Sequence, residues 1–429
     1  MVKKLLVQNG RVVDPSQNLD GDYDLLLVDG RVARIAESIK PRRGVEVLDA
    51  SGLIVVPGLI DMHVHLREPG QEYKETIESG TRAAAAGGFT AVACMPNTDP
   101  VNDNRSVTEH IVGEAERCGL ARVYPIGAVT KGEEGEELTE IGDMVAGGAV
   151  AISDDGRPVT SSEAMRRALL YSRHYDVAVI QHAEDLSLGA GGVMHEGEFS
   201  TRLGLPGLPG AAEDGMVARD ILLVEDNGGR YHVAHLSTAR GLELVKLAKR
   251  RGLSVTCEVT PHHLLLTDRE VLESGLSTQT KMKPPLRSEA DRQALLDGIA
   301  DGSVDVIASD HAPHHADEKD VEFSLAPFGI VGLETTLSLC LDRLVRPGVI
   351  DLSRLIELLS TNPARVLNVD GGTLAEGSAA DVTLFSLRRQ VTINPARFKS
   401  KGRNTPFAGW KLRGRPVMTI VGGQPVDAG

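Results

Sequence analysis

The sequence predicts an α/β fold: a closed (β/α)8 TIM barrel beside a small β-sandwich domain that is assembled from both termini. Between residues 59 and 368, a short apolar, β-branched run is followed by a turn and a segment of helical periodicity, and this unit recurs eight times. Such alternation requires a parallel sheet, and eight units over about 300 residues suit a closed barrel better than an open, doubly wound sheet. The two ends of the chain lack the unit and contain short alternating strands instead.

The apolar runs are the predicted barrel strands, and helices are predicted between them. The strands cover residues 59–65, 89–95, 122–129, 149–155, 177–184, 230–236, 253–260 and 304–310. The helices cover residues 76–86, 106–118, 137–146, 161–175, 211–225, 238–250, 288–300 and 334–344. Several helices begin at Ser or Thr and end at Gly, the residues favoured at helix N-caps and C-caps.

The terminal segments form the second predicted domain. In residues 1–56, hairpin turns are expected at Asn9-Gly10 and Asp29-Gly30. Residues 369–429 have the same character, with glycines as breaks and almost no helical signal. We therefore expect residues 57–368 to form the barrel, and residues 1–56 and 369–429 to form two parts of one β domain.

The chain is acidic: its 429 residues include 46 Lys and Arg and 60 Asp and Glu, for a formal charge of −14. This balance, without a long basic run, argues against nucleic acid and anionic membranes as partners. With 7 Phe, 6 Tyr and 1 Trp, the chain has few side chains that could stack on nucleic-acid bases. A small anionic substrate remains compatible, because one arginine or metal ion outweighs a diffuse field at contact distance.

The cysteine pattern and the apolar runs predict a cytoplasmic protein. The four cysteines stand far apart, and no pair has the spacing of a zinc finger or a redox motif. The apolar run at residues 5–7 is too short for a signal peptide, and the run at residues 53–60 is broken by Pro57-Gly58 and too short to span a membrane.

Histidines and carboxylates gather where the predicted strands end, which is the end that holds the active site of a barrel. His63 and His65 end the first strand. Because residues i and i+2 of a strand share a face, the two imidazoles point the same way and could bind one divalent metal. A polar strand end without metal is the alternative.

Four further strands end in residues of the same kind. Asp154 and Asp155 end the fourth strand, His182 the fifth, His235 the sixth and Asp310 the eighth. Taken singly, each is readily explained as a helix cap or a hydrogen-bonded core residue. Because the strand ends meet at one mouth, together they predict a metal site.

The ligand set is sufficient for two metal ions. His63 and His65 would hold one ion and His182 and His235 the other, with a carboxylate between them. Nitrogen and carboxylate ligands without thiolate suit Zn²⁺, with Mn²⁺, Co²⁺ and Fe²⁺ as alternatives. Such a pair activates water and polarises a carbonyl oxygen, and a nearby carboxylate, for which Asp310 is placed, must carry the proton to the leaving nitrogen. The predicted reaction is hydrolysis of an amide-like bond, or its reverse.

These motifs resemble the amidohydrolase superfamily and, within it, the bacterial type I dihydroorotase family. The resemblance covers nearly the whole chain. The His-x-His start is shared by many cyclic amidases, whereas the arginine that follows it and the MPNT and APFG runs are more particular to dihydroorotases. The segments that carry the resemblance are PGLIDMHVHLREPG at residues 57–70, MPNT at 95–98, SDDG at 153–156, KMKPPLR at 281–287, SDHAPH at 309–314 and APFGIVGLE at 326–334.

The resemblance implies a zinc-dependent, reversible cyclisation of N-carbamoyl-L-aspartate to (S)-dihydroorotate, with release of water, in pyrimidine synthesis. It implies that His63, His65, Asp155, His182 and His235 hold two metals. Asp155 rather than Asp154 would bridge them, given the spacing to His182. Asp310 would be a further ligand and the catalytic acid/base.

The resemblance also implies a set of substrate-binding residues. Arg67, Asn97 and His314 would bind the substrate carboxylate, for which the planar guanidinium fork is suited. His65 would face the substrate as well. Phe328 and Gly329 would contact the substrate ring.

One position departs from the family. Dihydroorotases usually carry an asparagine before the Pro-Pro-Leu-Arg run, where it touches the substrate, and this chain has Lys283. Lysine is longer and charged. Lys283 therefore either reaches the substrate differently or loses that contact.

Two other functions compete with this interpretation. A hydantoinase- or allantoinase-like cyclic amidase would share the barrel and the metals, but such relatives typically bridge their metals with a carboxylated lysine from strand four, where this chain has Asp154 and Asp155. A non-catalytic scaffold partner of aspartate transcarbamoylase would usually lack the metal histidines, which this chain keeps. Because some family members associate with that enzyme, it is a candidate partner, and we also expect a homo-oligomer.

Overall fold

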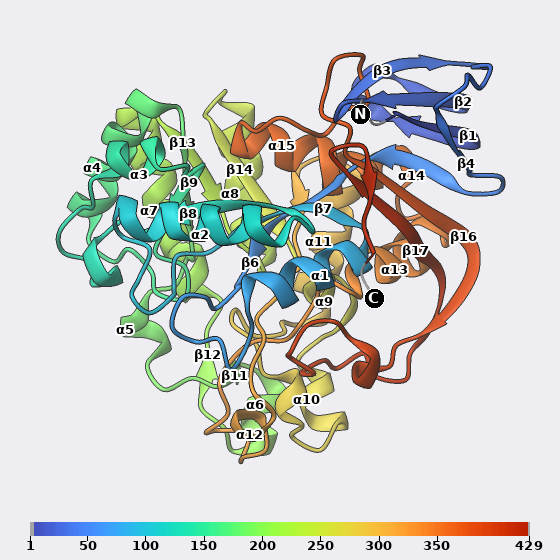
Figure 1. The fold of residues 1–429 in the computed structure, drawn as a ribbon. Helices are drawn as coiled ribbons and strands as arrows, with labels where there is room; N and C mark the ends of the chain where they lie inside the picture. The colour runs from blue at the N-terminus through green and yellow to red at the C-terminus, as the bar shows by residue number, and fades with distance from the viewer. Residues whose placement is uncertain (1–3, 428–429) are drawn as a thin grey trace.

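The computed structural model describes residues 4–427 and contains two large sheets, one of which closes into a barrel (Figure 1). The barrel strands pair in chain order, and each recorded pairing is parallel. They are β6 (Leu59–Val64), β7 (Phe89–Cys94), β8 (Arg122–Gly127), β9 (Ala151–Ser153), β10 (Ala178–Gln181), β13 (Arg230–Val233), β14 (Val255–Val259) and β15 (Val306–Ile307). The barrel closes where the His65 amide donates to the His311 carbonyl oxygen at 2.8 Å. The predicted barrel is confirmed.

A helix follows each strand near its predicted position. These helices are α1 (Ile77–Gly87), α2 (Arg105–Cys118), α3 (Ile141–Ala146), α4 (Ser162–Ser172), α7 (Ala211–Asn227), α8 (Ala239–Arg250), α11 (Glu289–Ala300) and α13 (Thr336–Cys340). Thr76, Ser161, Thr238 and Ser288 cap four of them by accepting backbone N–H groups. α3 begins later than predicted because the preceding loop forms a 3-10 turn and an isolated bridge between Thr130 and Leu138.

Side chains alternate between the two faces of each barrel strand and so pack into two separate hydrophobic cores. Ile60 and Met62 of β6, with Ala91 and Ala93 of β7, belong to the cluster that fills the barrel interior. Val92, between the two alanines, instead packs in the cluster beneath the helices. Because successive side chains of a strand point to opposite faces, burial on both sides fixes each strand along its length. The polar strand ends therefore have fixed positions at the mouth.

The second sheet draws strands from both ends of the chain. It contains β1 (Lys4–Asp14), β2 (Leu19–Val28), β3 (Arg31–Ala36), β4 (Glu46–Asp49), β5 (Ile54–Pro57), β16 (Val382–Thr392), β17 (Lys411–Val421) and β18 (Gln424–Pro425). β5 joins the two portions, because it pairs parallel with β1 and antiparallel with β16. Apolar side chains from both portions, including Leu25, Val55 and Val382, form a separate core.

One predicted hairpin turn is wrong and one is confirmed. β1 runs through Asn9 and Gly10 with a break in register, and Asn9 has a φ of 63°. This bulge lets β1 change its neighbour from β4 to β5, and a side chain at Gly10 would meet Val55 at 2.5 Å. The second predicted turn, at Asp29-Gly30, does join β2 to β3, with positive φ at both residues.

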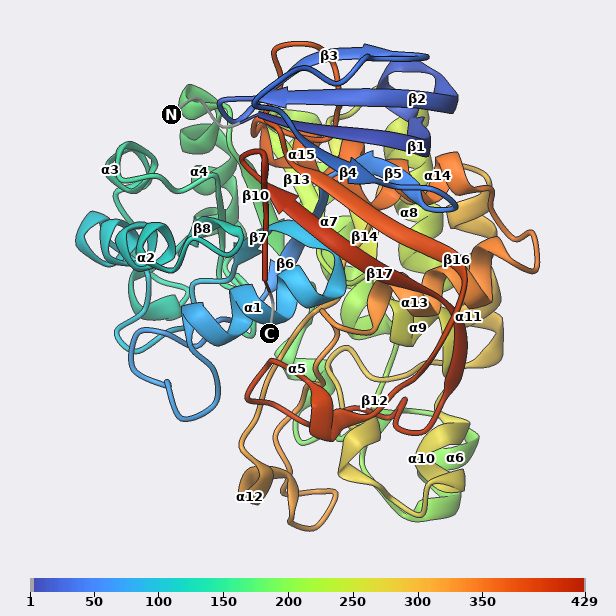
Figure 2. The ribbon, with the colours of Figure 1, turned by 45° about the vertical axis from the view of Figure 1, so that its right-hand side comes forward.

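The carboxyl ends of the barrel strands carry additional short elements. Figures 1 and 2 show α6 (Glu198–Leu203), α10 (Arg269–Glu273) and α12 (Ala316–Lys319) gathered at one end of the molecule, away from β1, β2 and β3. With α5 (Leu186–Gly189), β11 (Met194–His195), β12 (Gly207–Leu208) and α9 (Pro261–Leu265), they surround the barrel mouth. The insertion at 186–208 is not predicted from sequence, since it lacks a long periodic segment.

After the last barrel strand, α14 (Leu352–Ile356) and α15 (Asn362–Leu367) lead into the second sheet. No helix within residues 4–427 combines the length and apolar character needed to cross a membrane.

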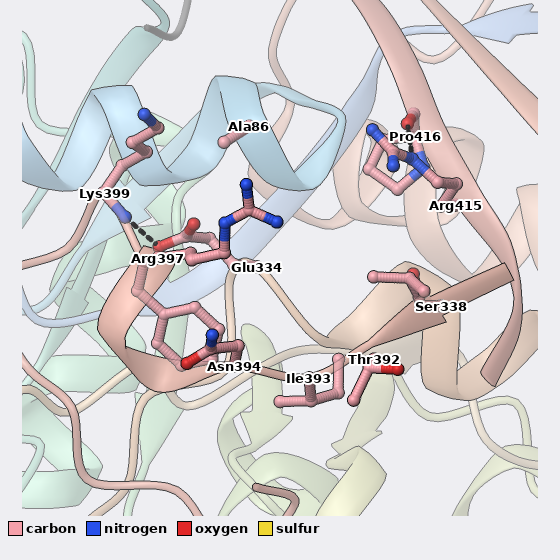
Figure 3. A pocket seen from close by; sticks show the side chains of 12 residues that line it. Ala86, Glu334, Ser338, Thr392, Ile393, Asn394, Arg397, Lys399, Arg415 and Pro416 are labelled. Atoms are coloured by element: carbon pink, nitrogen blue, oxygen red, sulfur yellow. Dashed lines mark hydrogen bonds between the residues drawn. The ribbon is translucent and has the colours of Figure 1, made fainter. Parts of the chain in front are cut away.

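The connection between β16 and β17, residues 393–410, extends along the barrel toward the mouth (Figure 2). Glu334 anchors it by accepting the backbone N–H groups of Lys399 at 2.7 Å and Ser400 at 3.1 Å. A hollow of about 420 Å³ lies between this connection, Ala86 of α1 and Glu334 (Figure 3). The connection between β16 and β17 thus attaches the second sheet to the side of the barrel, in addition to the covalent links of the chain.

A bidentate ion pair also joins the barrel to the second sheet. Arg122 of β8 donates to the Asp381 carboxylate at 2.6 and 3.1 Å, and the Gly422 amide donates to the same carboxylate at 2.7 Å. The Asp381 side chain is 7% exposed. Charge-assisted hydrogen bonds of this kind are stronger than those of exposed pairs.

We expect Asp381→Ala to lower the free energy of unfolding by about 2 kcal/mol, because two donors lose a charged acceptor. The shift of the urea unfolding midpoint, followed by circular dichroism, measures this. Asp20→Ala, which removes an exposed pair with Arg11, is the matched control and should cost no more than about 1 kcal/mol. Equal shifts for the two variants would contradict the role of Asp381.

Candidate active site

The predicted metal ligands converge at the barrel mouth. His63 lies in β6, and His65, Asp155, His182 and His235 each follow a barrel strand within two residues. All five are at most 5% exposed. Residues from five separate stretches of the chain thus meet because parallel strands end at the same rim.

Asp155 lies at the centre of this cluster. Its Oδ2 is 3.3 Å from His63 Nε2 and 3.6 Å from His65 Nε2. Its Oδ1 is 3.4 Å from His235 Nε2 and 3.7 Å from His182 Nδ1. Burial opposes ionisation, but the charge of His63 and the close ring nitrogens of the other histidines hold the pKa of Asp155 well below its usual range. One carboxylate oxygen therefore faces each histidine pair.

The donor set fits a pair of metal ions. His63, His65 and Asp155 offer ligand atoms within 4.8 Å of one another, and so do Asp155, His182 and His235. His63 Nε2 and Asp155 Oδ1 are buried and have no hydrogen-bond partner. Buried polar atoms are rarely left unpaired, and a cation would satisfy both. Imidazole and carboxylate ligands suit Zn²⁺ and related divalent ions.

Asp154, the alternative bridging residue, points away from the cluster. Its Oδ1 accepts the backbone N–H groups of Val129 at 2.7 Å and Thr130 at 3.0 Å, and its Oδ2 accepts the Thr130 hydroxyl at 2.5 Å. Asp154 thus holds the loop after β8. Its neighbour Asp155 faces the histidines, because adjacent residues at a strand end project to opposite sides.

Asp310 lies beside the first histidine pair. Its Oδ1 is 3.2 Å from His65 Nε2 and 3.6 Å from His63 Nε2. Arg67, His235 and Asp310 have positive φ angles of 62°, 31° and 48°. Non-glycine residues adopt this region at a cost, and such strain is concentrated at functional sites. The surrounding packing therefore holds these three side chains in position.

Sequence reasoning missed Glu258, a buried carboxylate of β14 that contacts the cluster. Its Oε1 lies 2.5 Å from His63 Nδ1, and its Oε2 lies 3.3 Å from His232 Nε2. Burial opposes its ionisation, but the charge of His63 and hydrogen bonds from both histidines lower the pKa of Glu258 to about 2. Because Glu258 accepts from Nδ1, the neutral form of His63, which metal binding requires, carries its lone pair on Nε2, the nitrogen that faces Asp155. The only sequence signal is an acid inside an apolar strand.

Asn97 orients His65, the other histidine of the first pair, as Glu258 orients His63. Its Oδ1 lies 2.9 Å from His65 Nδ1, so the ring donates to the amide oxygen and turns Nε2 toward Asp155 and Asp310. The amide nitrogen of Asn97 remains available to a ligand in the cavity. Asn97, predicted to bind substrate, therefore also orients a predicted metal ligand.

A cavity of about 330 Å³ opens next to the cluster. Its walls include every residue predicted to contact substrate, His65 among them, together with three further predicted metal ligands and Asp310. The lining residues are His65, Arg67, Asn97, Asp155, Gly156, His182, His235, Lys283, Asp310, Ala312, His314, Pro327, Phe328 and Gly329.

Arg67 gives this cavity a buried positive charge. It is 8% exposed, and Nε donates to the Pro313 carbonyl oxygen at 3.3 Å. Within residues 4–427 it forms no ion pair at 4.0 Å or less. Burial is the main cause that lowers the pKa of Arg67 from its ordinary value, yet arginine stays charged. The terminal nitrogens are therefore available to an anionic ligand.

Another wall of the cavity is held by Asn404, a residue of the connection between β16 and β17 that sequence reasoning also missed. Asn404 Nδ2 donates to the carbonyl oxygens of Ala312 at 2.9 Å and Gly329 at 3.1 Å, and its Oδ1 accepts the His314 amide at 3.2 Å. Gly329 has a φ of 120°, and a side chain there would meet the Ala312 Cβ at 2.6 Å. Glycine is thus required where this wall turns.

Comparison with known proteins agrees with this arrangement. A family model described as dihydro-orotase-like matches residues 52–241. A dihydroorotase from Anaeromyxobacter dehalogenans (strain 2CP-C) is 57% identical over 98% of this chain and 97% of that protein. A dihydroorotase from Citrifermentans bemidjiense is 52% identical over 98% of this chain and 99% of that protein.

Similar solved structures carry the same fold. An L-hydantoinase from Arthrobacter aurescens matches with a TM-score of 0.89 and 26% identity, over 99% of this chain and 96% of that one. A D-hydantoinase from a Thermus species matches with a TM-score of 0.83 and 26% identity, over 98% and 94%. Fold similarity is therefore shared with hydantoinases, whereas the much higher sequence identity is to dihydroorotases. The chain belongs to the dihydroorotase family of amidohydrolases.

Proposed function

We propose that this protein interconverts N-carbamoyl-L-aspartate and (S)-dihydroorotate, with release of water on ring closure, as a step of pyrimidine synthesis. The observation that carries the proposal is one cavity that holds both the Asp155 cluster and the unpaired guanidinium of Arg67. A hydrolytic centre thus lies beside a binding group for a carboxylate. Identities of 52–57% to dihydroorotases over 98–99% of this chain support the same activity.

The proposed cofactor is a pair of Zn²⁺ ions. His63 and His65 would hold one ion and His182 and His235 the other, with Asp155 shared between them. When bound, such ions would activate water as a nucleophile near neutral pH and polarise the substrate carbonyl. The unpartnered buried atoms of His63 and Asp155 support this assignment.

Asp310 would transfer the proton. In the hydrolytic direction, a water oxygen bonds to the ring carbonyl carbon, the ring C–N bond breaks, and Asp310 carries a proton from the water to the departing nitrogen. In ring closure the carbamoyl nitrogen attacks the carboxyl carbon, loses a proton, and water leaves. The position of Asp310 on the cavity wall, 3.2 Å from His65, supports this role.

The substrate carboxylate would bind opposite this centre. The guanidinium of Arg67 and the amide nitrogen of Asn97 offer donors, and His314 lines the same wall. His314 Nε2 donates to the Phe328 carbonyl oxygen at 2.8 Å, which holds the loop that carries Phe328 and Gly329 against the cavity. These contacts would orient the ring with its amide toward Asp310.

A hydantoinase-like activity is the main alternative, since the similar solved structures include hydantoinases. Hydantoin lacks a carboxylate and would leave the buried charge of Arg67 unpaired, which is costly. The homo-oligomeric state, the transcarbamoylase partner and the cytoplasmic location stay predictions.

Turnover of four compounds tests the proposal. With zinc supplied, the purified protein should hydrolyse dihydroorotate and form it from carbamoyl aspartate, while hydantoin and allantoin should react at least 100-fold more slowly, on the order expected when a buried polar group loses its partner. Chelator treatment should remove the activity, and added zinc should restore it. Faster turnover of hydantoin than of dihydroorotate would overturn the proposal.

Removing the proposed proton carrier should stop the chemistry without unfolding the protein. Asp310→Ala should lower kcat by about 10²- to 10⁴-fold, the usual contribution of general acid–base catalysis. Steady-state kinetics and circular dichroism measure both properties. Asp320→Ala changes an exposed aspartate nearby and should keep the wild-type kcat. Substantial residual activity in Asp310→Ala would show that another group moves the proton.

Removing the proposed carboxylate clamp should weaken substrate binding more than it slows the reaction. Arg67→Met should raise KM for dihydroorotate about 30-fold, which corresponds to about 2 kcal/mol for a lost charge-assisted contact. Arg82→Met, which removes a partly exposed ion pair with Glu78 on α1, is the control and should leave KM unchanged. An unchanged KM in Arg67→Met would show that the arginine has a role other than binding the substrate carboxylate.

A further inference from the structure

Lys283, the residue that departs from the family pattern, is held between two groups at the cavity wall. Its Nζ lies 2.9 Å from Glu184 Oε2 and 5.4 Å from the centroid of the Phe328 ring. The side chain is 25% exposed, whereas that of Glu184 is 8% exposed. A lysine at this position is therefore tethered to a buried acid, a contact that the shorter, neutral asparagine could not reproduce.

Glu184 has a second partner on the same oxygen. Its Oε2 also lies 3.2 Å from His182 Nε2. A neutral imidazole has one N–H, and a carboxylate can only accept, so His182 donates from Nε2 to Glu184. Its Nδ1 is then the nitrogen with a free lone pair. That nitrogen lies 2.9 Å from His235 Nε2 and 3.7 Å from Asp155 Oδ1, inside the cluster that could hold metal.

We propose that Lys283 is a positioning residue that acts on His182 through Glu184. Lys283 fixes the carboxylate, the carboxylate fixes the tautomer and ring orientation of His182, and Nδ1 is thereby presented to the metal. Groups that orient a metal-binding histidine in this way typically change metal affinity by about 10- to 100-fold when they are removed. The inference rests on the proposed metal pair, but not on the identity of the substrate.

The same contact removes an electrostatic conflict in the cavity. Glu184 brings a negative charge to the wall where an anionic substrate would bind, and like charges at contact distance repel. The ammonium of Lys283 offsets this charge and keeps further N–H donors for the cavity. Phe328, which also lines the cavity, limits its motion through a cation–π contact. Lys283 thus allows a carboxylate to orient His182 without excluding an anion.

Zinc affinity, measured by competition with a chromophoric chelator, tests the proposal independently of turnover. Lys283→Met and Glu184→Gln should each lower the affinity about 10-fold. The double variant should bind zinc no more weakly than Glu184→Gln alone, because the lysine acts only through the carboxylate. Lys283→Arg, which keeps the charge and the donors, should retain most of the affinity.

Lys281→Met is the matched control. Lys281 lies two residues away, with its Nζ 4.6 Å from the same Phe328 ring, but it donates to the Ser324 carbonyl oxygen and does not contact Glu184. It should bind zinc as the wild type does. Unchanged affinity in folded Lys283→Met, or additive losses in the double variant, would overturn the inference. Loss of zinc affinity in a protein that does not hydrolyse dihydroorotate would support the inference while refuting the proposed function.

Discussion

A single buried carboxylate shared by two pairs of histidines is the constraint on which this structure depends. Asp155 places one oxygen toward His63 and His65 and the other toward His182 and His235. Such a concentration of polar groups in a buried position is costly unless they are paired. The barrel makes it feasible, because two apolar cores fix every strand and bring the strand ends to one rim. The residual unpaired atoms point to the cation that would complete the arrangement.

Around this carboxylate, three of the four histidines are each oriented by a different acceptor. Glu258 accepts from His63, Asn97 from His65 and Glu184 from His182. In the neutral form that metal binding requires, one ring nitrogen of each histidine donates outward and the other carries its lone pair toward the centre. The acceptors come from β14 and from the loops after β7 and β10, so the chemistry depends on contacts between neighbouring barrel segments. Lys283 adds a cation to the last of these contacts.

The second sheet contributes to the site as well as to stability. Its long connection reaches the mouth, where Asn404 binds three backbone groups of the loop that forms one cavity wall. Glu334 and the ion pair between Arg122 and Asp381 hold the sheet against the barrel. The cavity is therefore shaped by residues separated by more than 300 positions in the chain, and the β domain cannot be regarded as a separate appendage.

By itself, the sequence determined the barrel, the residues that gather at its mouth and the reaction class. Strand and helix periodicity is local, and a residue's place at a strand end can be counted, so His63, His182, His235 and Asp310 could be assigned to one rim in advance. The tertiary structure alone showed that Asp154 turns away from the histidines to hold the loop after β8, that Asn9-Gly10 is a bulge, and that the barrel closes through His311. It also disclosed Glu258, Glu184 and Asn404, whose partners are distant in sequence. A hydrogen bond between such residues depends on direction and on a few tenths of an ångström, and no local pattern encodes either.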